Sequence, residues 1–368
     1  MQQIYLDNFA KKKKAKRGVG HTLLLFIVDL VVAIATFATC IGLTISLITQ
    51  HIEPETLGIL STVVLAAPLW FGFAVIALFY WLIRWKLSMV AIVAIFIGIS
   101  LFSIDKYYGV QFKKPGNKRY RDINYIKILS YNVANGDDDI LVDSVATLKA
   151  DIICLQEYLS DSDPRWQRLK HYNSTFNGEN DFSNEILTKH RILKQGKIDT
   201  LPRYNAVWAD VLIKYDTIRV VNLHLQSTSL RESDTQFIQS HEYILDTART
   251  TKFKDIINRL QTNNLKRREQ IKCITNFLDS SPKRPTIICG DFNDVPLSYT
   301  LAQFDKNYKN CFEEAGKGYI YTFDGFFRLL CIDYIYTSDD FDVVTYDVLY
   351  NLDHSDHYPI VTRLKLKK

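Results

Sequence analysis

The chain has 368 residues, which is enough for one large domain together with further segments. Its formal net charge of +5 comes from the first 125 residues, because residues 126–368 carry 31 Lys and Arg against 34 Asp and Glu. This distribution gives no sign of a basic nucleic-acid-binding surface over the large C-terminal part. The spacing of the six cysteines indicates neither a zinc site nor a disulfide framework.

The N-terminal part of the chain is predicted to lie in a membrane. Residues 11–17 read K-K-K-K-A-K-R. Three long apolar runs follow, at residues 22–48, 57–83 and 87–101. About 20 apolar residues form a helix that crosses a bilayer, so we expect a basic cytoplasmic N-terminus over residues 1–21 and three transmembrane helices within residues 22–104. Buried helices of a soluble protein are the alternative, but three such runs so close together argue against it. An ionisable group is costly inside a bilayer, so Asp29 is expected to face a partner helix.

The basic residues predict the orientation, because Lys and Arg beside membrane spans are retained in the cytoplasm. The block at residues 11–17 should stay there, and Arg84 and Lys86 lie in the second link between spans. Three crossings then place everything after residue 104 outside the cytoplasm. We therefore expect a multi-pass inner-membrane protein with a periplasmic C-terminal domain. The six basic residues of residues 105–124 argue the other way, but the first helix and the odd number of crossings weigh more.

Residues 105–124 read as a polar tether, and the pattern changes at residue 125. Short apolar runs then alternate with helical stretches. Strands are expected at residues 126–133, 151–156, 186–187, 206–213, 217–225, 287–290, 331–337, 344–349 and 358–366. One helix is expected at residues 140–149, and one or two more at residues 235–278. This alternation predicts one α/β domain over residues 125–368.

The stretch from Thr286 to Pro296 reads T-I-I-C-G-D-F-N-D-V-P and organises this domain. A short buried strand runs directly into Asp291 and Asn293, whose side chains share one face if strand geometry persists past Phe292. Polar groups at the end of a buried strand need a ligand or a metal. A strand that simply runs into an Asp/Asn turn is the alternative.

Matching polar side chains lie at the ends of five other expected strands. They are Asn132, Glu157, His224, Asp333, and Asp356 with His357. Each has an ordinary structural explanation on its own: a turn cap, a surface carboxylate, or a structural histidine. Together they supply two imidazoles and several oxygen ligands at strand ends. That combination is typical of a hard divalent cation and of acid–base chemistry on a phosphate.

Six ordered motifs carry a resemblance to a known family. They are S-Y-N-V at 130–133, L-Q-E at 155–157, N-L-H-L at 222–225, G-D-F-N-D at 290–294, I-D-Y-I at 332–335 and S-D-H-Y-P-I at 355–360. With them, residues 125–368 resemble the endonuclease/exonuclease/phosphatase superfamily of Mg-dependent phosphoesterases, and the three preceding spans resemble its membrane-anchored bacterial branch. The resemblance implies a four-layered α/β sandwich, with two packed mixed sheets and outer helices, preceded by three transmembrane helices.

The resemblance also implies a metal site. Glu157 would be the principal carboxylate ligand of Mg²⁺, with Mn²⁺ as a substitute, and Asn132 and Asp356 would lie close to the same ion. Oxygen ligands of this kind suit a hard divalent cation. A cation of this charge neutralises a phosphate ester for attack by water.

The remaining motif residues take acid–base and binding roles by the same resemblance. His224 would hydrogen-bond a phosphoryl oxygen or serve the leaving group, and Asp291 would position or deprotonate the attacking water. Asn293 would orient the substrate or the nucleophile. His357 would be the second acid–base or phosphate-binding imidazole, held by Asp333, because a carboxylate behind a histidine fixes its tautomer.

Two departures from the family pattern stand out. Glu185 lies in a strand that is more apolar in relatives, and Cys331 stands where an Arg is expected before Ile332. The signatures of the inositol-polyphosphate 5-phosphatases are also absent, which disfavours that branch.

Three functions remain open at this point. The first is a membrane-anchored phosphodiesterase or phosphatase that acts outside the cytoplasm on a small or lipid-linked phosphate ester. The second is an extracytoplasmic nuclease with a local basic groove, formed either by Arg165, Arg168 and Lys170 or by Lys266, Arg267 and Arg268. The third is a non-catalytic receptor for a phosphorylated ligand, which the complete set of polar residues argues against. The sequence indicates no protein partner.

Overall fold

The computed structural model describes residues 2–109, 125–134, 139–158, 164–175, 184–201, 204–229, 232–239 and 247–367. Its internal contacts divide the chain into two compact units. The helical unit consists of Met1–Thr44 and Ala66–Ser100, and the sandwich unit consists of Ile45–Leu65 and Leu101–Lys368. Most of the predicted tether, residues 110–124, lies outside the described residues.

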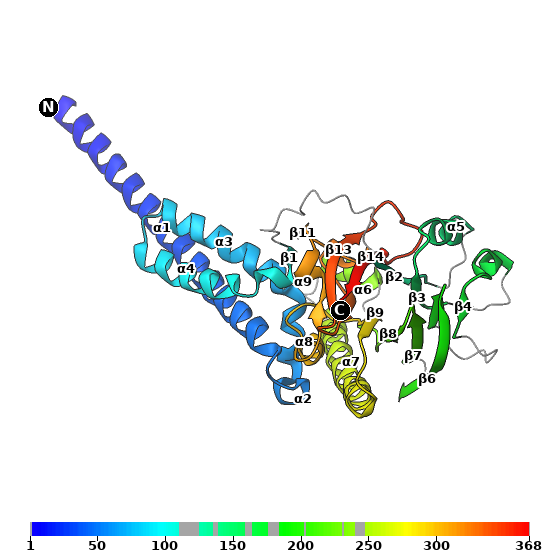
Figure 1. Cartoon of the computed structure of the whole chain (residues 1–368). Coiled ribbons are helices and arrows are strands. Elements are labelled where there is room, and N and C mark those ends of the chain that lie inside the picture. The colour runs from blue at the N-terminus through cyan, green and yellow to red at the C-terminus, as the bar shows by residue number, and fades with distance from the viewer. Residues whose placement is uncertain are drawn as a thin grey trace. The chain divides into compact units, whose positions relative to one another are not determined.

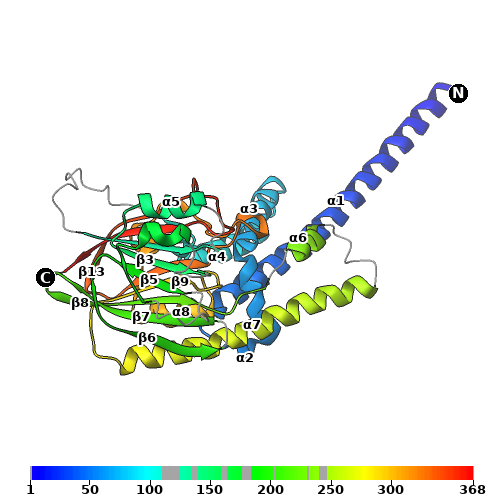
Figure 2. The same cartoon turned by 90° about the vertical axis from the view of Figure 1, so that its right-hand side faces the viewer.

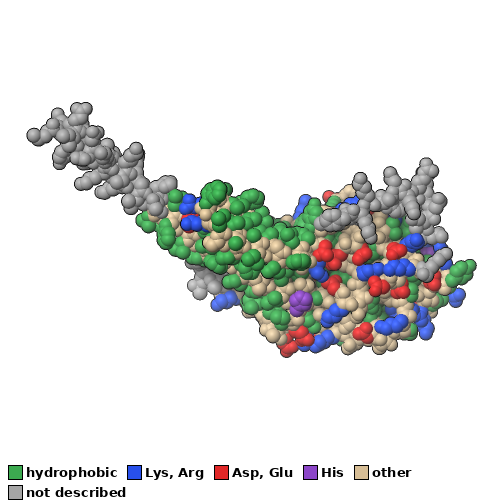
Figure 3. Space-filling model, turned by 60° about the vertical axis from the view of Figure 1, so that its left-hand side comes forward, with side chains coloured by type: hydrophobic (Ala, Val, Ile, Leu, Met, Phe, Trp, Pro, Cys, Tyr) green, Lys and Arg blue, Asp and Glu red, His purple; other side chains and the backbone are tan. Residues whose placement is uncertain are grey.

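The helical unit is built from three helices. They are α1 (Gln2–Thr49), α3 (Ala67–Ile83) and α4 (Leu87–Leu101) (Figure 1). By length and composition, Leu23–Thr49 and Pro54–Ile83 could each cross a membrane, whereas Leu87–Leu101 is a shorter apolar helix. Figure 3 shows hydrophobic side chains over most of the visible surface of this unit. Because exposed apolar side chains are costly in water, this composition is typical of helices in a lipid environment.

Polar contacts show that α1 and α3 run antiparallel. Arg84, at the end of α3, donates from Nε and Nη2 to the two carboxylate oxygens of Asp29, each at 2.8 Å. Further along, Trp81 donates from Nε1 to Thr36 at 3.0 Å. Near the other end, a side chain at Gly42 would collide with the Trp70 ring. Asp29 thus pairs with a partner helix, as an ionisable group within an apolar run requires.

The second apolar run is not one continuous helix. It starts with α2 (Pro54–Leu57), continues as the 3₁₀ helix η1 (Gly58–Ala66) and becomes α-helical only in α3. Gly58 has a φ of 56°, which ends α2. The hydroxyls of Ser61 and Thr62 each donate to a carbonyl three residues earlier, which supports the tighter 3₁₀ turn. The sequence did not show this division, because the whole run is apolar.

Two six-stranded mixed sheets form the sandwich (Figures 1 and 2). The first has the order β10 (Lys309–Asn310), β12 (Asp333–Thr337), β9 (Thr286–Asp291), β8 (Asp216–His224), β7 (Tyr204–Ile213) and β6 (Arg191–Leu201). The second has the order β13 (Phe341–Val348), β14 (Ile360–Leu366), β2 (Ile126–Asn132), β3 (Ile152–Gln156), β5 (Glu185–Thr188) and β4 (Asn173–Ser174). The pairs β2–β3 and β8–β9 are parallel, and the other neighbouring strands are antiparallel.

Helices cover the outer faces of both sheets. On the first sheet, α7 (Thr247–Ser280) buries Ile271, Ile274 and Leu278 in the main core. On the second, α5 (Asp139–Thr147) and the 3₁₀ helix η4 (Pro164–Leu169) enclose a separate apolar cluster. The layers are therefore helix, sheet, sheet and helix, which confirms the four-layered α/β sandwich.

Several short elements complete the unit. They are η2 (Ile104–Lys106), α6 (Glu232–Gln239), α8 (Tyr299–Asp305), α9 (Cys311–Ala315), η6 (Phe326–Arg328), and the strand pair β1 (Tyr108–Gly109) with β11 (Gly318–Tyr319). The expected strands are present within a few residues of their predicted bounds, but β6 and the two-residue strands β1, β4, β10 and β11 were not predicted. None of the six cysteines, all of which lie in described residues, forms a disulfide.

The stretch Ile45–Leu65 is part of the sandwich unit although it precedes the domain by some 60 residues in sequence. Its Val64 and Leu65 belong to a buried group that we name the junction cluster. The other members are Ile256, Leu260, Val295, Leu297, Leu330 and Ile332. Polar contacts add to this packing: Asn264 donates to the Ser61 hydroxyl at 3.0 Å, and Arg268 donates from Nε to Glu53 at 2.9 Å.

Candidate active site

The predicted site residues gather at one end of the sandwich because of strand register. His224 ends β8 and is the register partner of Asp291 at the end of the parallel strand β9. Asp333 begins the antiparallel strand β12 and also pairs with Asp291. In the second sheet, Asn132 pairs with Gln156, the residue before Glu157. The carboxyl ends of parallel strands therefore bring these side chains together, as in other α/β sheets.

The glycine of the GDFND motif is required by close packing. Gly290 has a φ of 138°, and a Cβ there would lie 2.0 Å from the carbonyl oxygen of Leu223 in β8. The strand then stops at Asp291, so the expectation of strand geometry beyond Phe292 is wrong. Instead Asn293 turns back with a φ of 53°, and its backbone N–H donates to Asp291 Oδ1 at 2.8 Å. This Asx turn, and not a shared strand face, brings the two side chains together.

Asp291 lies at the centre of the site. Its Oδ2 accepts hydrogen bonds from the amides of Asn132 at 3.1 Å and Asn293 at 3.0 Å. The same oxygen lies 3.7 Å from Nε2 of His224 and 3.7 Å from Nε2 of His357. Among the described residues no Lys or Arg pairs with this carboxylate. Burial is the main reason that the pKa of Asp291 rises to about 7.

His357 is held by Asp333, as predicted. The distance from His357 Nδ1 to Asp333 Oδ2 is 2.9 Å, and both side chains are buried. Burial lowers the pKa of His357, but Asp333 and Asp291 outweigh it and raise that pKa to about 10. The Phe323 ring packs edge-on at 5.2 Å from the imidazole. At neutral pH this arrangement keeps His357 protonated, with Nε2 directed at Asp291.

His224 has the opposite electrostatic environment. Its Nε2 lies 3.7 Å from Glu157 Oε1, and its side chain is almost completely buried. Burial, and then the charge of His357, lower the pKa of His224 to about 3. The site therefore combines one neutral imidazole and one cationic imidazole on either side of a single carboxylate.

Glu157 is much more open than Asp291 or Asp333, with a side chain that is 36% exposed. It has a φ of 53°, in the left-handed region that non-glycine residues rarely adopt. Asn132 donates from its amide nitrogen to Glu157 Oε1 at 3.1 Å, while its amide oxygen accepts from the backbone of Ala134. An amide nitrogen does not bind cations. The side-chain amide of Asn132 would therefore have to rotate by half a turn to present its oxygen to a metal ion.

Asp356 lies at the edge of the site. Its side chain is exposed, and the neighbouring Ser355 hydroxyl lies 3.4 Å from its Oδ1. The same hydroxyl lies 2.9 Å from the carbonyl oxygen of Asn132, which ties this loop to the end of β2. The structure thus brings Asp356 beside the cluster, but it does not bring its carboxylate into hydrogen-bond contact with Glu157.

A second arrangement could also hold an ion, because Asp291, Asp333 and His357 offer ligand atoms within 4.8 Å of one another. All three are buried, and Nδ1 of His357 is already bonded to Asp333. An ion bound by these three residues would break the hydrogen bond between His357 and Asp333, and it would lie beside a protonated imidazole. The open oxygen atoms of Glu157 and Asp356 fit a hydrated divalent cation better, because Mg²⁺ usually keeps several waters.

Sequence reasoning misplaced Arg267. It was considered part of a basic groove, but its side chain is fully buried in the sandwich unit. Its neighbour Arg268 pairs with Glu53 and Glu55, so neither guanidinium is available to a nucleic acid. The signal was present in the helix periodicity, because Arg267 is four residues before Ile271 and lies on the same apolar stripe of α7.

The two departures from the family pattern are accommodated internally. Glu185 is buried, and its carboxylate accepts a hydrogen bond from Ser174 at 2.6 Å. Cys331 is also buried, and its carbonyl accepts from the hydroxyl of Tyr334 at 2.6 Å.

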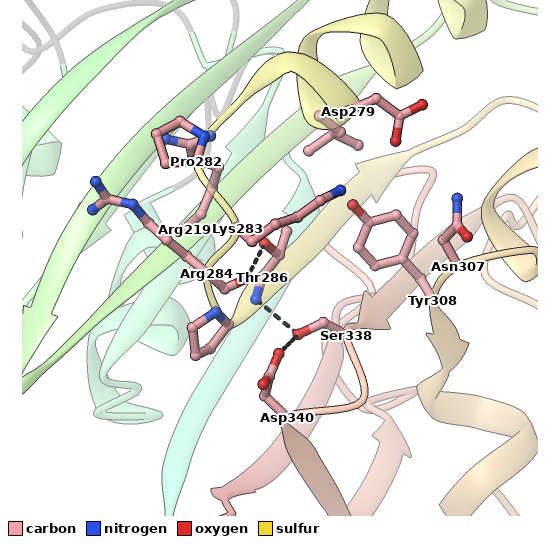
Figure 4. A pocket seen from close by; sticks show the side chains of 12 residues that line it. Arg219, Asp279, Pro282, Lys283, Arg284, Thr286, Asn307, Tyr308, Ser338 and Asp340 are labelled. Atoms are coloured by element: carbon pink, nitrogen blue, oxygen red, sulfur yellow. Dashed lines mark hydrogen bonds between the residues drawn. The ribbon is translucent and has the colours of Figure 1, made fainter.

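A surface pocket lies at the opposite end of the first sheet, away from these residues (Figure 4). It is lined by Arg219, Leu278, Asp279, Pro282, Lys283, Arg284, Pro285, Thr286, Asn307, Tyr308, Ser338 and Asp340. Hydrogen bonds link the Thr286 backbone to Ser338 at 2.9 Å and Ser338 to Asp340 at 2.6 Å (Figure 4). This pocket contains neither imidazole of the site.

A four-layered sandwich with imidazoles and carboxylates at its strand ends defines a class of protein, the hydrolases of phosphate esters. The sequence agrees with this class. The family model of the Endonuclease/Exonuclease/phosphatase family matches residues 129–357, more than half of the chain, and the chain belongs to that family. Its members hydrolyse phosphate esters and generally use divalent metal ions. A second family model, a domain of unknown function (DUF8431), matches residues 26–107.

Solved structures provide further likenesses. An endonuclease/exonuclease/phosphatase from Bacteroides vulgatus is 17% identical, with a TM-score of 0.49, over 66% of this chain and 99% of that chain. TDP2 from D. rerio in complex with a single-strand DNA product is 16% identical, with a TM-score of 0.47, over 66% and 99%. A mannosyl-6-phosphatase from Bacteroides thetaiotaomicron is 18% identical, with a TM-score of 0.45, over 65% and 99%. Comparison with curated proteins gives no match. None of these likenesses bears on the substrate of this chain.

Proposed function

We propose that the protein is a membrane-anchored, Mg²⁺-dependent phosphodiesterase or phosphatase that hydrolyses a small or lipid-linked phosphate ester outside the cytoplasm. The observation that carries the chemistry is the environment of Asp291, a buried carboxylate with a pKa near 7 that has two imidazoles and two amides around it. A group with a pKa near the working pH is suited to accept a proton from water.

The side chains then divide the work. Asp291 takes the proton of the attacking water. Asn293 keeps the carboxylate of Asp291 in place by donating two hydrogen bonds to it. His357, protonated and held by Asp333, donates to a phosphoryl oxygen and stabilises the charge that develops there. As the water adds, the bond from phosphorus to the leaving oxygen breaks; the neutral His224 orients that oxygen, which takes its proton from solvent.

The metal fits the open side of the cluster. Glu157, with Asn132 in contact with it and Asp356 on the loop tied to the end of β2, would hold Mg²⁺, and Mn²⁺ would substitute for it. When bound, the ion supplies charge neutralisation for the phosphate and polarises its oxygen.

The sandwich unit itself supports the proposed topology. Ile45–Leu65 and Leu101–Lys368 share one compact unit, so both must lie on the same side of a membrane. The intervening helices α3 and α4 then cross an even number of times, and α1 adds one further crossing. The N-terminal basic block and the sandwich therefore lie on opposite sides, and a cytoplasmic N-terminus places the sandwich outside.

The charge distribution favours a small or lipid-linked substrate over duplex DNA. Proteins that grip a duplex use several Lys and Arg on its phosphates. Residues 126–368 are slightly acidic overall, and Arg267 and Arg268 are occupied by internal contacts. The six basic residues of the tether are next to the last apolar helix in sequence, where anionic headgroups would attract them.

The activity is tested with the full-length protein in detergent, with Mg²⁺ or with chelator. We would measure turnover of bis(4-nitrophenyl) phosphate, phospholipid vesicles and supercoiled plasmid at about 150 mM salt, where weak electrostatic binding is screened. Asp356→Asn should lower activity, whereas its matched control Asp353→Asn, on the same exposed loop, should not. Plasmid nicking that disappears in His224→Ala, with no activity on the other substrates, would establish the nuclease instead.

The topology is tested separately with reporter fusions after the last residue. Alkaline phosphatase, which is active only outside the cytoplasm, should be active in this position, and a reporter that works only inside should not. The reverse pattern would disprove the orientation without affecting the chemistry.

A further inference from the structure

Arg267 is the most deeply buried charged side chain next to the site. It lies in α7 and has no exposed surface. A buried guanidinium costs free energy unless its donors are satisfied and its charge is paired. Its place in the core therefore depends on the groups that it holds.

Those groups belong to the two loops that carry the site. Arg267 donates from Nη1 to the carbonyl of Gln226 at 2.8 Å, two residues after His224. Its Nε lies 3.3 Å from Oδ2 of Asp294, three residues after Asp291. One side chain thus bridges the segments that follow β8 and β9.

The rest of α7 and the N-terminal segment support this bridge. Gln270, one turn further on, accepts from the backbone N–H of Gln226 at 2.8 Å. On the other side, Nη2 of Arg267 donates to Asn264, which in turn donates to the Ser61 hydroxyl at 3.0 Å. The guanidinium is therefore fixed in direction by a helix and by Ile45–Leu65.

The two loops also contact each other directly. The backbone of Leu225 donates to the carbonyl of Asp291 at 2.9 Å, and Asn293 donates back to Leu225 at 3.1 Å. Asn293 and Leu297 both have positive φ values, 53° and 66°. Residues held in this region persist only where the surroundings impose it.

We propose that Arg267 is a positioning residue that fixes the spacing between His224 and Asp291 by bridging Gln226 and Asp294. The planar fork of arginine can reach both loops at a defined angle, which the single ammonium of lysine cannot do. A misplacement of reacting groups by about 1 Å costs on the order of 100-fold in rate. The inference rests on the hydrolase function proposed above.

The test separates positioning from stability by means of a double variant in the full-length protein. Arg267→Met alone leaves Asp294 as an unpaired buried charge, so it should lower both stability and turnover. Adding Asp294→Asn removes that charge and should recover the melting temperature. Turnover in the double variant should nevertheless stay about 10- to 100-fold below wild type with KM within about twofold, because the bridge is still missing. Arg268→Met, the neighbouring arginine that contacts Glu53 and not the loops, should keep wild-type kcat.

Hydrogen exchange provides a readout that does not need a substrate. Faster exchange in the double variant should be confined to the amides of residues 225–229 and 293–297. Wild-type kcat in the double variant, equal losses in Arg267→Met and Arg268→Met, or exchange that accelerates throughout the sandwich would each overturn the proposal. If wild-type protein turns over none of the substrates, the proposed function fails, and the exchange pattern alone decides the role of Arg267.

Discussion

The first sheet contains a buried aspartate near each end, and the two have opposite environments. Asp210 accepts from Arg219 Nε at 2.9 Å and Nη2 at 3.1 Å, and Arg284 lies 3.3 Å from it. Arg219 in turn stacks on the Trp208 ring at 4.9 Å. Asp291, equally buried, has imidazoles and amides around it and pairs with no described Lys or Arg. A single sheet thus contains one buried aspartate that is paired with arginine and one that is surrounded by imidazoles and amides.

The difference distinguishes a structural acid from a functional one. A carboxylate with a bidentate guanidinium is ionised and unavailable, because its lone pairs are used and its charge is balanced. A buried carboxylate that has no guanidinium or ammonium partner, and only an imidazole as its cationic neighbour, keeps a raised pKa and can exchange a proton or respond to a metal. The pocket in Figure 4 lies at the end of the sheet where Asp210 pairs with arginine. The presence of a pocket there does not make that end the site of reaction.

The strongest test of this contrast removes one carboxylate at the candidate site and one at the pocket. Glu157→Gln should abolish activity while the protein remains folded, because a neutral amide cannot replace an anionic ligand of Mg²⁺. Asp279→Asn, at the pocket, should leave turnover unchanged. Activity and melting temperature of both variants would be measured with Mg²⁺, and wild-type activity that survives chelation would contradict a metal at Glu157.

A second test addresses the pair Asp333 and His357. Asp333→Asn should lower kcat by about 10³-fold and change KM little, because it misorients the imidazole and does not remove a binding contact. Steady-state kinetics of the variant and the wild type would show this division. Equal kcat values would remove Asp333 from the mechanism.

For stability, the two aspartates should rank in the opposite order: the substitution at Asp210 should cost more than the substitution at Asp291. Asp210→Asn leaves the buried Arg219 without its counter-charge and should cost about 3–5 kcal/mol. Asp291→Asn removes a carboxylate whose only cationic neighbour is the imidazole of His357, which Asp333 still holds, so it should cost less than Asp210→Asn. Thermal unfolding of the two variants in detergent would rank them, and a larger loss for Asp291→Asn would break the comparison.

The stability difference between Asp291→Asn and wild type should also depend on pH in chelator-treated protein. The pKa of Asp291 is about 7 when folded, against 3.8 for the ordinary carboxyl group. The folded protein therefore keeps a proton that the unfolded chain has lost, and this contribution to stability disappears as the pH rises from about 4 to 7. The melting temperature of Asp291→Asn relative to wild type should rise over the same range. A constant difference would mean that the carboxylate is not perturbed.

The positions of the candidate site residues could be predicted from the sequence more fully than those of the residues that support them. Asn132, Glu157, His224 and Asp291 directly follow apolar strands, so local patterning and strand register suffice to group them. β6 was missed because Lys194, Gln195, Gly196 and Lys197 interrupt any apolar alternation, as is common at a sheet edge. The pairing of Arg267 with two distant loops and the 3₁₀ turn of residues 58–66 depend on tertiary contacts, which no local pattern contains.

The junction cluster also has a consequence for the order of events during synthesis. Val64 and Leu65 leave the ribosome long before Leu330 and Ile332, the partners on which they pack. At roughly 5–20 residues per second, the intervening stretch of about 265 residues takes on the order of 15–50 s to make. In the proposed topology, α3 and α4 are translated and inserted in that interval, while the segment before them does not yet have these partners. If the proposed topology holds, the junction cluster forms only after membrane insertion is complete, because its last members come from the final third of the chain.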